Sequence, residues 1–465
     1  MGWSFHHDPE VTMTGTKNKN HTMDMTEGPL LSKILLFTIP LMFSSILQIL
    51  FNAADIVVVG KFVGDTALAA VGSNSALVNL VTNLFIGLSI GANVVVARYF
   101  GAKKEKETSV AVHTSIALGF ASGILLTAIG IAGAPFFLRL MMTPPDVLSQ
   151  AVLYLRIYFL GMTFTMVYNF GSAILRAVGD TKRPLYFLLF AGILNVLLNL
   201  IFVIALKMSV AGVALATILS QAVSCILVLL CLARENSSIK LSLRKLSINK
   251  IKFIQIIKIG LPAGCQGVVF ALSNTVIQSS VNSFGSVVMA GNAAAQNVEG
   301  IVYFAMNSFY QAAISFTSQC FGAKKYSRIN RILFLSLLCV ITAGGVCGYT
   351  LLFFGGSILK IFSSSQSVVA AGMNRLSIIL STYFLCGIMD VLVGVLRGIG
   401  YSVLPMVVAL LGSCVLRLIW LATVFQMPAF HTPSTIFASY PISWAITLSV
   451  HAVCFAVLRR KIGRQ

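Results

Sequence analysis

The chain divides into twelve apolar segments, separated by short loops that carry charges, proline or glycine. A helix needs about 20 apolar residues to cross the hydrocarbon core of a bilayer, and each segment meets that length. Only 10% of the 465 residues are charged, against about 25% in a soluble domain. The sequence therefore predicts an all-α polytopic membrane protein. We expect transmembrane helices near 34–59, 67–98, 109–138, 148–178, 184–206, 210–233, 254–280, 286–320, 329–355, 368–399, 404–426 and 436–458.

Lysine and arginine gather on one side of this predicted bundle, in the loops that follow even-numbered helices, in the stretch 234–258 and in residues 459–464. Loops rich in these residues face the cytoplasm. We therefore expect a multi-pass protein of the plasma membrane, or a bacterial inner membrane, with both termini cytoplasmic. The net charge of +20 is then explained by topology and contact with anionic membrane lipid. Nucleic acid is not an expected partner.

Residues 1–28 are polar and lack the apolar core of a cleaved signal peptide. We expect them to form a disordered cytoplasmic tail. Organised sequence begins near Thr26, and Met23 and Met25 are alternative start positions.

An internal repeat organises the remainder of the chain. The motif Phe-Gly-Ala-Lys-Lys at 100–104 recurs unchanged at 321–325, and Leu-Arg-x-x-Gly at 175–179 recurs at 396–400, both at an offset of 221. Each half holds six helices, so both halves begin on the same side and are related by a pseudo-two-fold axis along the membrane normal. The glycines and cations of these motifs are expected to end helices and contact the inner leaflet. We expect an N-lobe over 29–234, a basic linker over 235–252 and a C-lobe over 253–465.

A carboxylate inside a bilayer is costly and needs a specific reason to be there. In the first predicted helix, Gln48, Asn52 and Asp55 share one face. Asn195 and Asn199 are an i, i+4 amide pair in the fifth helix. Amide and hydroxyl oxygens with one carboxylate suit a small cation, although a carboxylate satisfied by neighbouring amides has the same pattern. The candidate site for coupling H⁺ or Na⁺ consists of Asp55, Asn195, Asn199 and Thr217, with Na⁺ held by the first three.

The second half has its own polar groups inside the predicted helices. Glu299 and Asp390 are acids there, and Arg375 and Arg417 are the available partners for a structural ion pair. Aromatic residues that line the cleft are suited to hold an aromatic cation, with Phe51, Tyr168, Tyr303, Phe304 and Tyr310 as examples. The candidate substrate cavity consists of Gln48, Asn52, Tyr168, Asn169, Gln296, Glu299 and Asp390.

With these residues in view, the chain resembles the multidrug and toxic compound extrusion (MATE) family over about 27–460. The resemblance lies in Pro40 with Asn52-Ala-Ala-Asp55, in both repeated motifs, in Asn195-x-x-x-Asn199 and in 212–217. It implies two six-helix lobes that export amphipathic organic cations in exchange for Na⁺ or H⁺. It also implies that Asp55, Asn195, Asn199 and Thr217 form the N-lobe coupling site. Many family members carry aspartate at Asn199, so here Asp55 is the lobe's one formal charge.

Other function classes fit the sequence less well. A flippase for lipid-linked saccharides is the alternative within transport, and it predicts a cleft rich in lysine and arginine. An enzyme is not expected, because no H-E-x-x-H, G-x-S-x-G or P-loop occurs. The nine cysteines include no C-x-x-C pair, so neither a zinc site nor a disulfide framework is indicated. We expect a monomer with no cofactor other than the coupling ion.

Overall fold

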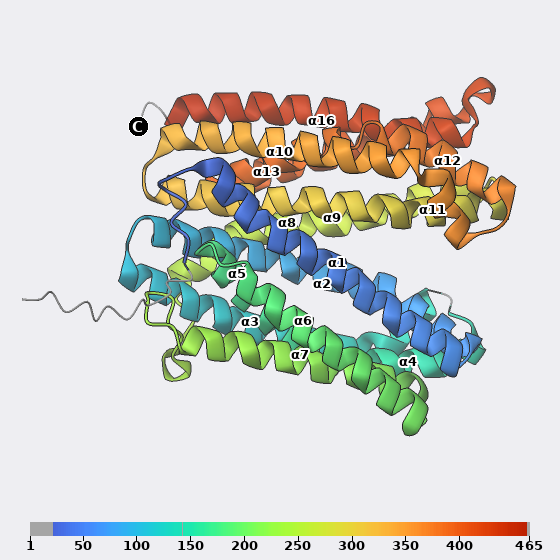
Figure 1. Ribbon diagram of the computed structural model, residues 1–465, viewed down its shortest axis with the longest axis horizontal. Coiled ribbons are helices and arrows are strands. Elements are labelled where there is room, and N and C mark those ends of the chain that lie inside the picture. Colours follow the sequence, from blue (N-terminus) through green and yellow to red (C-terminus); the bar gives the residue numbers. More distant parts are fainter. Residues whose placement is uncertain (1–21, 142, 463–465) are drawn as a thin grey trace, which may run out of the picture.

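The computed structural model describes residues 22–141 and 143–462, and within these ranges the protein is a bundle of helices without strands (Figure 1). The helices form two lobes, as the repeat predicts. The N-lobe contains α1 (Leu30–Phe62), α2 (Asp65–Gly101), α3 (Glu105–Leu140), α4 (Pro145–Leu160), α5 (Met162–Ala177), α6 (Lys182–Asn199) with the π-helix η1 (Leu200–Ala205), and α7 (Ser209–Ala233).

The short 3₁₀ turn η2 (Leu243–Lys245) lies in the linker between the lobes. The C-lobe repeats the order of the N-lobe. It contains α8 (Lys250–Asn282), α9 (Ser286–Gly322), α10 (Tyr326–Phe353), α11 (Gly355–Phe362), α12 (Gln366–Leu380), α13 (Phe384–Gly398), α14 (Val403–Ala409), the π-helix η3 (Leu410–Val415), α15 (Leu416–Ala422), the 3₁₀ turns η4 (Val424–Gln426) and η5 (Pro428–Phe430), and α16 (Pro433–Ile462). The predicted membrane segments match these helices to within a few residues.

Helix length and hydropathy support the predicted membrane-crossing segments. Nine helices of the described ranges are long and apolar enough to cross a bilayer, and two bent pairs bring the number to eleven. The remaining long helix is α9, whose 37 residues include Glu299 and several amides. Together these elements account for the twelve predicted segments.

The repeat is visible in local geometry as well as in sequence. The α4–α5 pair bends by 45° and the α12–α13 pair by 46°. Gly161 lies at the first break and Thr382, 221 residues later, at the second. Residues 221 apart also share left-handed backbone angles, and these pairs are Gly64 with Gly285, Gly179 with Gly400, and Lys103 with Lys324.

The lobes meet closely towards the end of the bundle that carries the lysine-rich loops, here called the basic end. Gly101, the last residue of α2, touches α9: a Cβ atom on it would lie 2.2 Å from the carbonyl oxygen of Gln319. By the same symmetry, a Cβ on Gly322 would lie 1.9 Å from the carbonyl oxygen of Arg98. The repeated motif therefore does more than end a helix, because its glycine allows the two lobes to touch.

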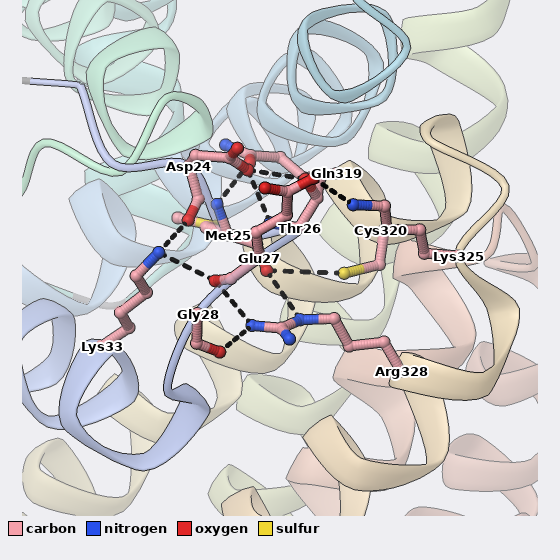
Figure 2. Close-up of polar contacts among 10 residues, drawn as sticks. All are labelled: Asp24, Met25, Thr26, Glu27, Gly28, Lys33, Gln319, Cys320, Lys325 and Arg328. Atoms are coloured by element: carbon pink, nitrogen blue, oxygen red, sulfur yellow. Dashed lines mark hydrogen bonds and ion pairs between the residues drawn. The ribbon is translucent and has the colours of Figure 1, made fainter.

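The expectation of a disordered tail is wrong for residues 22–28. Met25 is completely buried in the same apolar cluster as Phe37 and Phe316. Its amide donates to Gln319 of the C-lobe (Figure 2), and the amide of Met23 donates to the carbonyl of Val178 in the N-lobe. The sequence does not reveal this contact, because residues 1–28 are polar on average and a single buried methionine produces no hydropathy signal. Residues 1–21 lie outside the described ranges.

Candidate functional site

The four residues of the predicted coupling site lie together in the N-lobe. Asn199 donates a hydrogen bond of 2.5 Å from Nδ2 to Oδ1 of Asp55, and its Nδ2 is 3.3 Å from Oδ1 of Asn195. Asn195 in turn donates to Oγ1 of Thr217 over 3.5 Å. Thr217 completes the chain by donating to the carbonyl of Val213. Helices α1, α6 and α7 thus contribute one connected network.

Close packing of two helices holds the carboxylate beside the amides. A Cβ atom on Gly192 of α6 would lie 1.8 Å from the ring of Phe51 on α1, so glycine lets the helices approach here. Both helices continue from this contact in the same direction, Phe51 by one turn to Asp55 and Gly192 by two turns to Asn199. Asp55 is only half-buried, whereas Asn199 is completely buried.

The network has free capacity to accept a cation or a proton. Oδ1 of Asn199 is buried and has no hydrogen-bond partner among the described residues. The π-helix η1 begins at the next residue, and such irregular turns often accompany functional sites. Carboxylate, amide and hydroxyl oxygens are ligands that suit Na⁺ or another hard cation. No group of three or more His, Cys, Asp or Glu side chains able to hold a metal occurs in the described ranges.

The other predicted N-lobe cavity residues do not join this network. Gln48 and Asn52 are exposed on α1. Tyr168 on α5 donates a 3.2 Å hydrogen bond to the carbonyl of Pro184, which ties it to the first turn of α6. Asn169 beside it is half-buried.

In the C-lobe, the acid Glu299 is paired with Arg375. Nε of Arg375 lies 2.7 Å from Oε1 and Nη2 lies 2.8 Å from Oε2 of Glu299. Nη1 of Arg375 donates to Asn292, and both members of the ion pair are buried. The sequence left Arg375 and Arg417 as alternative partners. Arg417 instead donates to Ser443 and lies over the ring of Tyr440, 4.1 Å from its centroid.

This ion pair forms part of the wall of a cavity of about 430 Å³ in the C-lobe. The predicted residues Gln296, Glu299, Tyr303 and Phe304 line it. Three further aromatic residues line it that the sequence did not single out, namely Tyr383, Tyr440 and Trp444. The i, i+4 spacing of Tyr440 and Trp444 was an available signal, but it does not show which face of the helix meets a cavity.

Asp390 lies outside the residues that line the cavity. It is half-buried on α13, within electrostatic range of Tyr303 and Arg397. Arg397, expected to contact the membrane surface, is instead buried and donates to Gln266 over 2.8 Å and to the hydroxyl of Tyr310. The inward direction of this arginine adds a positive charge close to Asp390.

Known proteins resemble this chain in sequence and in fold. The MatE family model matches twice, at residues 40–201 and 262–423, one match per lobe. The probable multidrug resistance protein YpnP of Bacillus subtilis is 31% identical over 398 residues, which are 85% of this chain and 88% of that protein. The probable multidrug resistance protein NorM of Thermotoga maritima is 25% identical over 83% of this chain and 84% of its own.

Solved structures give the same fold. An outward-facing multidrug resistance MATE family transporter of the MOP superfamily superposes with a TM-score of 0.88 at 20% identity, over 95% of this chain and 98% of that one. A MATE structure in complex with MaL6 gives a TM-score of 0.89 at 19% identity, over 95% and 99% of the two chains. The double family match and the relatives establish that the chain is a member of the MATE transporter family.

Proposed function

We propose that the protein is a secondary antiporter that exports amphipathic or cationic organic compounds in exchange for H⁺ or Na⁺, with its two lobes opening alternately to the two sides of the membrane. The observation that carries the proposal is the hydrogen bond between Asp55 and Asn199 within the N-lobe network. An ionisable group inside a transporter commonly marks the path of an ion or a proton.

The Asp55 network suits an ion-coupling role for a simple electrostatic reason. The carboxylate lies in an apolar bundle with amides and a hydroxyl as its polar neighbours, and no lysine or arginine forms a salt bridge to it among the described residues. A negative charge that is half removed from water and has no cation beside it is costly, and binding H⁺ or Na⁺ removes that cost. Because Asp55 lies on α1 and Asn199 on α6, we expect occupancy of the site to alter the hydrogen bond that joins these two helices.

The C-lobe cavity supports export of aromatic compounds. The rings of Tyr383 and Trp444 stack with centroids 5.4 Å apart, and Tyr303 and Phe304 lie beside them in the lining. Aromatic faces attract organic cations. Because Arg375 neutralises Glu299, the attraction comes from ring faces and amides rather than from a free carboxylate. Several relatives are named as multidrug resistance or export proteins, which agrees with such a substrate class.

The direction of export follows from the charged loops. We propose that the basic end faces the cytoplasm, because it carries the loops rich in lysine and arginine. The membrane is then the plasma membrane, or the inner membrane of a bacterium.

The test is transport of a fluorescent organic cation in proteoliposomes under separate Na⁺ and H⁺ gradients. We expect one gradient to drive transport in the unaltered protein and Asp55→Asn to abolish that dependence. Asp390→Asn is the matched control, since it removes the C-lobe's half-buried acid and leaves the N-lobe network intact. Full gradient-driven transport by Asp55→Asn would refute the coupling role.

A flippase for lipid-linked saccharides is the alternative, and the same vesicles distinguish it. That function needs free cations to hold a diphosphate, and the cavity's Arg375 is already paired with Glu299. Translocation of a labelled polyprenyl-diphosphate saccharide without cation transport would favour the alternative.

A further inference from the structure

Residues 23–28, here called the N-terminal strap, lie at the basic end and contact both lobes. Figure 2 shows residues 24–28 between Lys33 on one side and Gln319, Cys320, Lys325 and Arg328 on the other. They precede α1, and α1 belongs to the N-lobe. The strap also touches the N-lobe elsewhere, because the amide of Met23 donates a 2.9 Å hydrogen bond to the carbonyl of Val178, just after α5. Lys33 on α1 fixes the strap's shape by donating to the carbonyls of Asp24 and Glu27.

Arg328 of α10 provides the main attachment of the strap to the C-lobe. Its Nε donates to the carbonyl of Met25 over 3.1 Å, and its Nη2 donates to the carbonyls of Glu27 and Gly28, each over 2.8 Å. Lys325 adds a 2.7 Å ion pair with the Glu27 carboxylate. The guanidinium reaches the three carbonyl oxygens from two nitrogens held apart in a rigid plane, whereas a lysine would have to reach all three from a single nitrogen.

The strap also covers a direct contact between the lobes. Gln319 of α9 donates from Nε2 to the carbonyl of Ala177 in the N-lobe over 2.7 Å and accepts from the amide of Met25 at Oε1 over 3.1 Å. Cys320 donates to the carbonyl of Met25. The Met25 side chain is completely buried in the cluster that contains Ile329. One C-lobe glutamine thus bonds to both the N-lobe and the strap.

We propose that the strap is a latch that holds the two lobes together at the basic end and must release before that end opens. The proposal rests on the proposed alternating opening of the lobes. The strap is covalently continuous with the N-lobe, whereas its hydrogen bonds to Gln319, Cys320 and Arg328 are to the C-lobe. Separation of the lobes at the basic end breaks one set of contacts or the other. The latch therefore favours the state in which this end is closed.

The test measures the distance between the basic ends of the lobes, and it needs neither substrate nor coupling ion. Spin labels at Lys106→Cys on α3 and Arg331→Cys on α10 occupy exposed positions, one in each lobe. The parent for labelling retains the four buried cysteines, Cys320 among them. Its five half-buried cysteines are replaced by alanine, namely Cys231, Cys265, Cys339, Cys347 and Cys454.

We expect Arg328→Ala to increase the fraction of molecules with a longer distance between the two labels. This fraction should be at least several-fold larger than in the parent protein. Arg460→Ala removes an exposed arginine from the same end and is expected to leave the distances unchanged. Arg328→Ala also removes a positive charge from this end, which weakens the electrostatic repulsion between the lobes. If repulsion controlled the spacing, the variant would bring the lobes closer together, whereas the latch predicts that they move apart. Arg328→Lys keeps the charge but loses the three-carbonyl contact, and it is expected to open as well.

An unchanged distance distribution in Arg328→Ala would overturn the latch. Should that variant fail to fold, Lys33→Ala releases the strap from the other side and is expected to give the same longer distances. Failure of the proposed function is seen separately, because transport can be absent while the distances still respond to Arg328→Ala.

Discussion

Arg375 and Glu299 form a two-point ion pair inside the C-lobe, with Nε to Oε1 at 2.7 Å and Nη2 to Oε2 at 2.8 Å. Both side chains are nearly inaccessible to solvent. A buried pair of this kind is costly to break from one side only, because the remaining charge loses its partner. The cavity that it borders therefore presents little net charge to a ligand.

Arg375→Ala is expected to lower the free energy of unfolding by about 3–5 kcal/mol, because it leaves the Glu299 carboxylate buried and unpaired. The double variant Glu299→Met/Arg375→Met removes both charges and is expected to lose much less. Reversible unfolding in mixed micelles measures both values. Equal losses in the single and double variants would contradict the ion pair's role.

Asn199→Ala is expected to reduce gradient-driven transport about ten-fold or more, since a hydrogen bond to a charged group contributes about 1.5–3 kcal/mol. Its loss leaves Asp55 without its amide donor. Asn297→Ala is the control, because that amide is exposed on α9 and, among the residues that the structure describes, bonds only to its own helix. Initial rates in proteoliposomes measure the effect. Similar initial transport rates in Asn199→Ala and Asn297→Ala would show that Asn199 does not contribute to the coupling site.

Trp444→Ala is expected to weaken binding of an aromatic organic cation by about two-fold to thirty-fold, because a cation–ring contact contributes about 0.5–2 kcal/mol. Phe353→Ala is the control, since that ring is 83% exposed and lies outside the cavity lining. Fluorescence titration of the purified protein measures the two affinities. A loss confined to Phe353→Ala would place substrate elsewhere.

The sequence predicts the long-range architecture well and the inward-facing contacts less well. Apolar length and the offset of 221 locate the helices and the two lobes, because membrane-crossing segments need apolar length and repeats retain their spacing. The Asp55–Asn199 contact is also predictable, since an intramembrane acid needs a polar neighbour. These signals depend on residue type and spacing alone.

Three other contacts depend on how each helix is rotated about its own axis and on how deep each residue lies in the bundle. Hydropathy does not encode either quantity. Both Arg375 and Arg417 were eligible partners for Glu299, and only their positions in space select Arg375. Arg397 ends a helix, as expected, yet points inward to Gln266. Met25 is buried although its neighbours are polar.

Gly101→Ala and Gly322→Ala are each expected to open the basic end, because the added Cβ would meet a backbone carbonyl of the opposite lobe at about 2 Å. Backbone atoms cannot move aside as a flexible side chain can. Gly345→Ala is the control, since a Cβ there meets nothing within 4 Å, and alanine favours a helix by about 1 kcal/mol. The spin-label pair at Lys106 and Arg331 measures opening. Unchanged distances in both repeat variants would show that the glycines serve only their own helices.

The acid response of the strap follows from the charges around Glu27. A hydrogen bond from Lys325 and its positive charge lower the pKa of Glu27, and Lys103 adds to this effect while Asp24 opposes it. Burial alone would raise the pKa of Asp24, but hydrogen bonds from Thr26 and nearby lysines lower it overall. A carboxylate with a lowered pKa stabilises the folded contact above its ordinary pKa and loses that contribution as the pH falls through the lowered value.

The closed basic end is therefore expected to be insensitive to pH between about pH 8 and pH 5.5, and to loosen only in stronger acid. Glu27→Gln removes the carboxylate that pairs with Lys325 and is expected to weaken the latch equally across this range. Glu105→Gln, an exposed acid at the start of α3, is the control. Distance measurements across the pH series give the result. A longer-distance population that appears between pH 7 and pH 5.5 would show that another group controls the latch.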